Sequence, residues 1–365
     1  MKNAVCVVLC VAAATLAVAA RPADSTTAWN PRAAATYLDG RMDWWLQWSG
    51  AQRDHDTACV SCHTAVPYAL ARPALRGALV EHDVAAPERR MLDNVVKRVR
   101  LWKDVEPFYP DQTRGLPKTS ESRGTEAVMN ALILATRDGN AAPPALSDDA
   151  RQAFANMWPL QFRAGDQTGA WAWLNFHYEP WEANDSPFFG AALAAVAIGT
   201  APGDYAKTPD IQDKVAALRT YLAKHVDDEI LSNKVMALWA SAKLGGVVSG
   251  PQAHAIFTAL SERQQADGGW AISSLGPWKR VDGSASETAS DGYATGLIVF
   301  AVRQAGVGRD EPRLAKAIAW LEQHQDPATG MWRAASLNKQ RDPASDAGKF
   351  MSDAATAYAS LALAR

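Results

Sequence analysis

The stretch Gln265-Ala-Asp-Gly-Gly-Trp270 joins a segment rich in charged residues to an apolar one. Gln161 to Trp171 (QFRAGDQTGAW) and Gln325 to Trp332 (QDPATGMW) combine glutamine, glycine and tryptophan in the same order and stand between similar neighbours. Glycine and aspartate mark turns, because they adopt backbone conformations that other residues avoid. The three stretches therefore predict turns of one kind, each joining an outer helix to the following inner helix.

The segments around these turns alternate between two kinds of helix. The first kind is amphipathic, and several members open with helix-start residues such as Pro31 and Ser147. Its members are 31–49, 86–103, 147–164, 209–227, 250–266 and 310–325. The second kind is apolar and rich in alanine, as expected of helices that are buried on all sides. Its members are 64–80, 124–136, 185–199, 231–245, 291–306 and 352–364.

This alternation is an internal repeat of helical hairpins. We expect an all-α fold of the (α/α)6 toroid type, with six outer and six inner helices, in which residues 21–365 form a single domain. An open α-solenoid is the alternative architecture. The glutamine-tryptophan turns favour closure.

The three turn stretches resemble the Gln-Trp repeats of the squalene-hopene cyclase and terpenoid cyclase superfamily, over about residues 150 to 335. The resemblance implies that the glutamine caps helix ends and that the indole packs on the next repeat. The chain departs from the hopene cyclases because it lacks their D-x-D-D acid motif. Its later repeats also contain no cysteine, so the zinc site of the related protein prenyltransferases is not expected.

A second motif, Cys59-Val-Ser-Cys62-His63, has the C-x-x-C-H spacing by which two thiols attach a c-type haem and the imidazole binds the iron. The other two cysteines, Cys6 and Cys10, lie in the N-terminal leader. We therefore expect covalent haem c, with His63 as the proximal ligand. Two alternatives remain open, a disulfide or redox dithiol, and a structural zinc site that would need a further ligand.

The distal side of the iron has two main candidates. His177 lies in the aromatic stretch WAWLNFHYEPWE, which we expect to overhang the mouth of the cavity, and Met351 lies beside the last apolar segment. Without a protein ligand the iron would keep an open position for a small molecule.

Four acidic residues recur at or near the start of apolar segments, namely Glu126, Asp185, Asp291 and Asp353. Because the repeats are equivalent, we expect these residues at the same cavity mouth as the haem motif. There they are candidate catalytic residues that position a substrate or relay protons. The alternative is helix capping, in which each carboxylate accepts free backbone N–H groups.

The N-terminal segment predicts export. Lys2 precedes an apolar run over 4–18, and small residues follow, so residues 1–20 are expected to be a signal peptide and the mature protein to be periplasmic or secreted. The run is too short to span a membrane, so no membrane span is expected after cleavage. A net charge of −2 without a basic block argues against nucleic acid as a partner.

Three functions follow from these features. The first is a haem c oxidoreductase that holds an apolar or partly apolar small molecule in the central cavity and exchanges electrons with a periplasmic donor or acceptor. The second is a terpenoid cyclase-like isomerase or lyase in which the haem is auxiliary. The third is a non-enzymatic electron-transfer or ligand-binding protein. The missing acid motif counts against the second function, and we favour the first.

Overall fold

The computed structural model describes residues 29–111 and 117–364. The predicted signal peptide lies outside these residues. Within them the regular secondary structure is almost entirely helical, and its only sheet is an antiparallel pair of short strands, β1 (Gln52–Arg53) and β2 (Thr57–Ala58). The all-α prediction is therefore confirmed. None of the helices in the described ranges has both the length and the apolar character required to cross a membrane.

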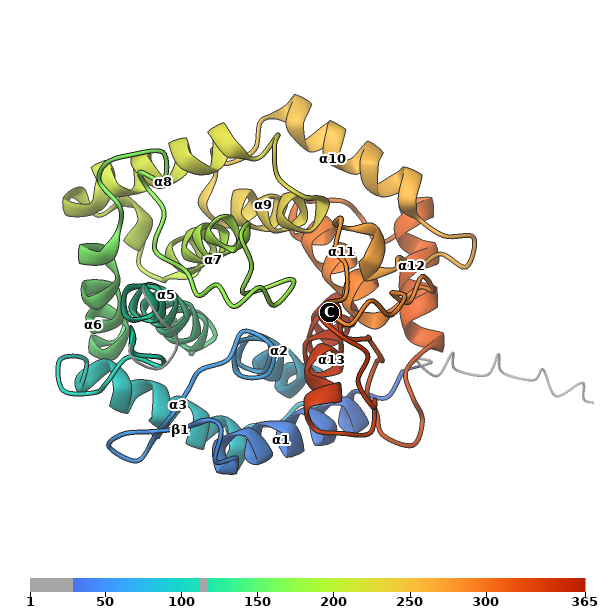
Figure 1. The fold of residues 1–365 in the computed structure, drawn as a ribbon, viewed down its shortest axis with the longest axis horizontal. Helices are drawn as coiled ribbons and strands as arrows, with labels where there is room; N and C mark the ends of the chain where they lie inside the picture. The colour runs from blue at the N-terminus through green and yellow to red at the C-terminus, as the bar shows by residue number, and fades with distance from the viewer. Residues whose placement is uncertain (1–28, 112–116, 365) are drawn as a thin grey trace, which may run out of the picture.

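Two sets of helices alternate along the chain, and Figure 1 shows one set lying inside the other. The outer set consists of α1 (Pro31–Gln47), α3 (Ala86–Arg100), α6 (Asp148–Met157), α8 (Gln212–His225), α10 (Gly250–Arg263) and α12 (Pro312–Gln323). The inner set consists of α2 (Ala65–Ala78), α5 (Lys118–Gly139), α7 (Ser186–Thr200), α9 (Leu231–Leu244), α11 (Gly292–Gln304) and α13 (Phe350–Leu363).

The inner helices contact one another in chain order, and the last of them, α13, also contacts the first, α2. Their small residues permit close approach. At Gly296 of α11, for example, a Cβ atom would lie 2.6 Å from the backbone nitrogen of Ala359 in α13. Residues 188–198 of α7 are all buried, and each fully buried Leu, Ile or Phe side chain contributes about 1.5–3 kcal/mol to stability.

The outer helices begin at capping residues that the sequence supplies. Asn30 accepts a hydrogen bond from the backbone N–H of Ala33 at the start of α1, and Ser147 accepts one from Ala150 at the start of α6. Ser249 and Gln252 form a reciprocal capping box at the start of α10. Such caps satisfy N–H groups that have no partner within the helix.

The first glutamine-tryptophan turn connects three elements by side-chain hydrogen bonds. Gln161 donates through Nε2 to the carbonyls of Gly169, in its own turn, and Lys214, in α8, both at 3.0 Å. Trp171 is fully buried and donates through Nε1 to the carbonyl of Met157 at the end of α6. The turn therefore joins the outer helix α6 to the next outer helix, α8.

The second turn repeats this arrangement with a shift of one residue from the prediction. Gln264 donates to the carbonyls of Gly268 and of Arg313 in α12, both at 2.8 Å. Gln265, the residue chosen from the sequence, instead donates to the carbonyl of Thr288. The capping glutamine is thus the first of the two consecutive glutamines, because α10 ends at Arg263 and Gln264 occupies its C-cap.

The third turn, which follows the last outer helix, α12, contacts the start of the first outer helix, α1. Gln325 exchanges two hydrogen bonds with the backbone of Asn30, which caps α1, and also donates to the carbonyl of Gly330. Trp332 lies 6.0 Å from Trp29, between ring centroids. We call the contacts of α1 and α2 with α12, α13 and this turn the seam.

Candidate functional site

The Cys59–His63 motif lies between β2 and the start of α2, and its backbone is held by several partners. The N–H of Cys59 donates to the carbonyl of Ala51 at 2.7 Å, and Trp45 Nε1 donates to the carbonyl of Cys59 at 2.7 Å. Ser61 Oγ accepts from the backbone N–H groups of Thr64 and Ala65, at 3.2 and 3.0 Å, and so caps α2. The motif is therefore a fixed turn.

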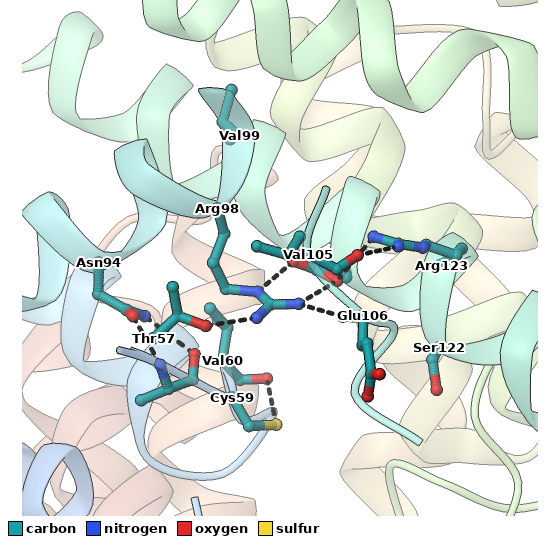
Figure 2. Close-up of polar contacts among 12 residues, drawn as sticks. Thr57, Cys59, Val60, Asn94, Arg98, Val99, Val105, Glu106, Ser122 and Arg123 are labelled. Atoms are coloured by element: carbon teal, nitrogen blue, oxygen red, sulfur yellow. Dashed lines mark hydrogen bonds and ion pairs between the residues drawn. The ribbon is translucent and has the colours of Figure 1, made fainter. Parts of the chain in front are cut away.

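A buried ion pair supports the strand that leads into the motif (Figure 2). Arg98, on α3, is fully buried and contacts Glu126, on α5, through two hydrogen bonds of 2.5 and 3.1 Å. The same guanidinium donates to Thr57 Oγ1 at 2.6 Å and to the carbonyl of Glu106 at 2.9 Å. On the other side, Asn94 exchanges two hydrogen bonds with the backbone of Ala58. Glu126 thus fixes the position of Thr57, two residues before Cys59.

Both thiols are free and buried. Burial raises the pKa of Cys59 to about 12 and that of Cys62 well above its ordinary value, so both are neutral thiols. A neutral buried thiol is a poor nucleophile and a poor reductant. The thiol of Cys62 lies 3.6 Å from the sulfur of Met129. In the part of the chain that the structure describes, no three His, Cys, Asp or Glu side chains gather as a metal-binding group.

The motif lines a cavity of about 230 Å³, which we call the aromatic cavity. Cys59, Val60, Ser61 and His63 form one wall. Other lining residues come from the loop that follows Trp173, from the loop before α13, and from the start of α13. Its aromatic lining consists of Trp45, Trp48, Tyr109, Phe176, Tyr178, Trp181 and Phe350, and its methionines are Met129 and Met351.

The imidazole of His63 is oriented by a chain of hydrogen bonds. Its Nδ1 lies 2.8 Å from Thr64 Oγ1, and that hydroxyl donates to Asp353 Oδ2, also at 2.8 Å. Asp353 is buried and receives two further hydrogen bonds, from Arg41 Nε and from the hydroxyl of Tyr37, both at 2.8 Å. Because the Thr64 proton is directed to Asp353, the Thr64 oxygen accepts from His63, which places the proton on Nδ1.

This arrangement leaves the lone pair of His63 on Nε2, which forms no hydrogen bond within the described residues, and an imidazole in this form can bind a metal. Burial, with smaller effects of Arg41 and Arg341, lowers the pKa of His63 to about 3, so the ring is neutral at physiological pH. The ring stacks on Phe350, with 3.9 Å between centroids, and meets Trp45 edge-on at 5.0 Å.

Two glutamates in the aromatic cavity, Glu179 and Glu182, lie on a short hairpin in which Tyr178 and Glu182 pair. Burial raises the pKa of each carboxyl to about 7, and in Glu179 the charge of Asp185 adds to the effect. Within the described residues, the buried Glu179 Oε2 has no hydrogen-bond partner. Neither glutamate was predicted from the sequence. The signal that could have found them is the stretch EPWE, in the same aromatic loop as His177.

The four predicted carboxylates do not line the aromatic cavity together. Glu126 and Asp353 are fully buried in ion pairs with Arg98 and Arg41. Asp291 caps α11 by accepting from the backbone N–H groups of Tyr293 and Ala294. Asp291 also lines another cavity, of about 180 Å³, which shares Ser336 with the aromatic cavity, and burial raises the pKa of Asp291 to about 7.

Asp185 precedes α7 and makes no capping hydrogen bond through its side chain. Its link to the aromatic cavity is its effect on the pKa of Glu179. Of the two predicted distal ligands, Met351 is buried and lines the cavity, whereas His177 is exposed and does not. His177 has a left-handed backbone, with φ of 57°, which turns the loop at that point. The placement therefore favours Met351.

No protein-family model matches the chain, and no curated protein is significantly similar to it in sequence.

Proposed function

We propose that this protein is an exported redox enzyme that carries haem c, bound through Cys59, Cys62 and His63. We also propose that its helices form an (α/α)6 toroid of the terpenoid cyclase kind. The observation that carries the functional proposal is the position of the C-x-x-C-H motif. It lies in the wall of an aromatic cavity, with Nε2 of its histidine free and Nδ1 occupied by Thr64. The closed order of inner-helix contacts supports the toroid.

The donor set fits a covalently bound haem. Both thiols are free, Cys59 lines the cavity, and Cys62 is separated from it by the flexible side chain of Met129. The volume of about 230 Å³ is below the range of about 300–1,000 Å³ that is usual for small-molecule sites. Binding of a porphyrin would therefore require cavity side chains to move, and Phe350, stacked on His63, is the first of these.

A bound haem supplies one-electron chemistry. His63 would hold the iron through Nε2, and the buried Arg41–Asp353 pair keeps the imidazole in one orientation. Glu182, with a pKa of about 7, exchanges protons readily at neutral pH and can accept or donate a proton at its carboxylate oxygens. Met351 is our candidate for the distal side.

The substrate that we propose is an apolar or partly apolar small molecule, because aromatic and methionine side chains dominate the cavity lining. Electrons would pass to or from a periplasmic donor or acceptor. Periplasmic or secreted localisation follows from the signal peptide predicted over residues 1–20.

Non-enzymatic electron transfer is a second candidate, favoured by the small volume of the cavity, which a porphyrin would fill. The cyclase-like isomerase or lyase is less well supported. Protonation of an alkene requires a strong acid, whereas burial makes Glu179 and Glu182 weaker acids than ordinary glutamates.

Expression with a haem-attachment system tests the proposal. We expect the mass of the mature chain to increase by one haem and the increase to disappear in a Cys59→Ser, Cys62→Ser double variant. A carbon monoxide-sensitive reduced spectrum would favour the enzyme, and an insensitive six-coordinate spectrum the electron carrier. A wild-type chain that matures without added mass would exclude haem c. His63→Ala is the matched variant, which keeps both thiols but lacks the proposed proximal ligand.

A further inference from the structure

A second cavity, of about 370 Å³, adjoins the aromatic cavity, and we call it the arginine cavity. Its charged side chains are Arg280, Arg333, Arg341 and a single carboxylate, Glu287. Ser336 and Arg341 line both cavities, so the two share part of their wall. Three cations against one anion is a local excess of positive charge in a chain whose net charge is −2.

The three guanidinium groups are held differently. Arg280 donates to the carbonyls of Ser336 and Ala285, at 3.0 and 2.7 Å, so it is anchored without a carboxylate partner. Arg333 forms an exposed ion pair with Glu287 at 3.1 Å. Arg341 is half-buried, and no hydrogen bond or ion pair joins it to another residue of the described ranges. Its charge nevertheless reaches the aromatic cavity, where it contributes to the low pKa of His63.

A partly exposed guanidinium group in a cavity wall, without an ion pair in the described residues, is available to a bound anion. The guanidinium group matches a carboxylate in shape, and the two form paired, charge-assisted hydrogen bonds. Next to Arg341 lies a cavity lined by aromatic rings. The neighbouring surfaces therefore match the two halves of an amphipathic carboxylic acid.

We propose that the two cavities form one composite site, in which the aromatic cavity holds the apolar part of a ligand and Arg341, beside the anchored Arg280, binds its carboxylate. This inference rests on the proposed function, because it specifies the ligand chemistry of the same site. The carboxylate can come from two sources, a propionate group of the porphyrin or an amphipathic acid that serves as substrate.

Matched pairs of probes distinguish the two sources. The full chain, purified without haem attachment, is titrated with protoporphyrin IX and its dimethyl ester, and separately with pyrenebutyrate and its methyl ester. Quenching of tryptophan fluorescence reports binding, since Trp45, Trp48 and Trp181 line the cavity. We expect at least one acid to bind about tenfold more tightly than its ester, the effect of one charge-assisted contact.

The variants locate the effect. Arg341→Gln should abolish the preference for the acid, and Arg341→Lys should retain part of it. Arg163→Gln should leave the preference unchanged, because Arg163 is exposed and lines neither cavity. Preference for protoporphyrin alone identifies the propionate, and preference for pyrenebutyrate alone identifies a substrate.

Equal binding of acid and ester, absence of binding by all four probes, or a preference that survives Arg341→Gln would overturn the inference. The pyrenebutyrate titration does not depend on haem attachment. A chain that fails to gain the mass of haem but discriminates pyrenebutyrate from its ester would therefore refute the proposed function and retain the composite site.

Discussion

Thr64 is the residue through which the buried ion pair of α1 and α13 acts on His63. Its hydroxyl has one proton and directs it to Asp353, so the oxygen is left to accept from the imidazole. A side chain of the same shape without a hydroxyl would remove both contacts. Thr64 therefore determines the tautomer of His63, and this effect can be tested in the absence of any cofactor.

We predict that Thr64→Val gives a mixture of the two tautomers of His63, whereas Thr64→Ser keeps the proton on Nδ1. The measurement is the pair of ¹⁵N chemical shifts of the imidazole in the haem-free chain. Thr64→Val should also cost about 1–3 kcal/mol of stability, because buried Asp353 loses a donor. An unchanged tautomer in Thr64→Val would contradict the proposed orientation.

Glu182 predicts a dependence of stability on pH. Its pKa is about 7 in the folded protein and near 4.5 when unfolded, so the folded state binds the proton more tightly. The resulting stabilisation is present below about pH 4.5 and is lost as pH rises to about 7. The wild type should lose unfolding free energy between pH 5 and pH 8, and Glu182→Gln should reduce that loss by up to about 2.5 kcal/mol. Parallel denaturation profiles for variant and wild type would show that Glu182 titrates normally.

At the residue scale, the sequence indicates the C-x-x-C-H motif, because that pattern depends on local spacing alone. It does not indicate the contacts around the motif. Asp353 and Glu126 were identified as functional candidates, but their partners, Arg41 and Arg98, come from other helices. A pattern along the chain cannot reveal such contacts.

Among the elements, the third glutamine-tryptophan turn requires glycine at position 330 for two reasons. Gly330 has a φ of 80°, in the left-handed region, and a Cβ atom there would collide with the backbone of Ala33 in α1. Gly306, which follows α11, has a φ of 93° but open space around it. The two positions therefore separate backbone strain from steric overlap.

We predict that Gly306→Ala costs about 1 kcal/mol, from the left-handed conformation alone. Gly330→Ala should lower the free energy of unfolding by about 1–3 kcal/mol more than Gly306→Ala does, because α1 must also move. Urea denaturation of the two variants gives the comparison. Equal losses would show that the third turn does not press against α1.

Helix class and order were predictable, and helix ends less so. The outer helix predicted over 147–164 ends at Met157, because Trp158–Leu160 continues as a short 3₁₀ helix. The inner helix predicted over 124–136 begins earlier, at Lys118. Its first turn is polar, and tertiary contacts support it, with Lys118 donating to the carbonyl of Asn175 and Ser122 to that of Tyr109. Hydrophobic periodicity does not detect a helical turn that is stabilised by distant polar partners.

On the scale of the whole molecule, the seam contains a buried ion pair. Arg41 and Asp353 are almost inaccessible to solvent, and Arg41 also contacts the half-exposed Asp346. Removal of one partner from a buried pair leaves an uncompensated charge, whereas an exposed partner contributes little. Substitution of Asp353 and, as a control, of Asp346 therefore tests how much the buried ion pair stabilises the seam.

We predict that Asp353→Asn costs about 3 kcal/mol and that Asp346→Asn costs less than about 1 kcal/mol. In Asp353→Asn, hydrogen exchange should accelerate in α1, α2 and α13 and remain slow in α7 and α9, because neighbouring repeats stabilise one another most strongly. If hydrogen exchange accelerated equally in all the outer and inner helices, the seam would not unfold independently of the rest of the molecule.

The burial of Cys59 and Cys62 bears on how the proposed haem would be attached. Phe350 and Asp353 of α13 contact His63 and its hydrogen-bonding partner, and α13 is the last helix within the described residues. Under the proposed function, a porphyrin would reach these thiols most easily before α13 docks. The rate at which α13 docks would then set the time available for attachment.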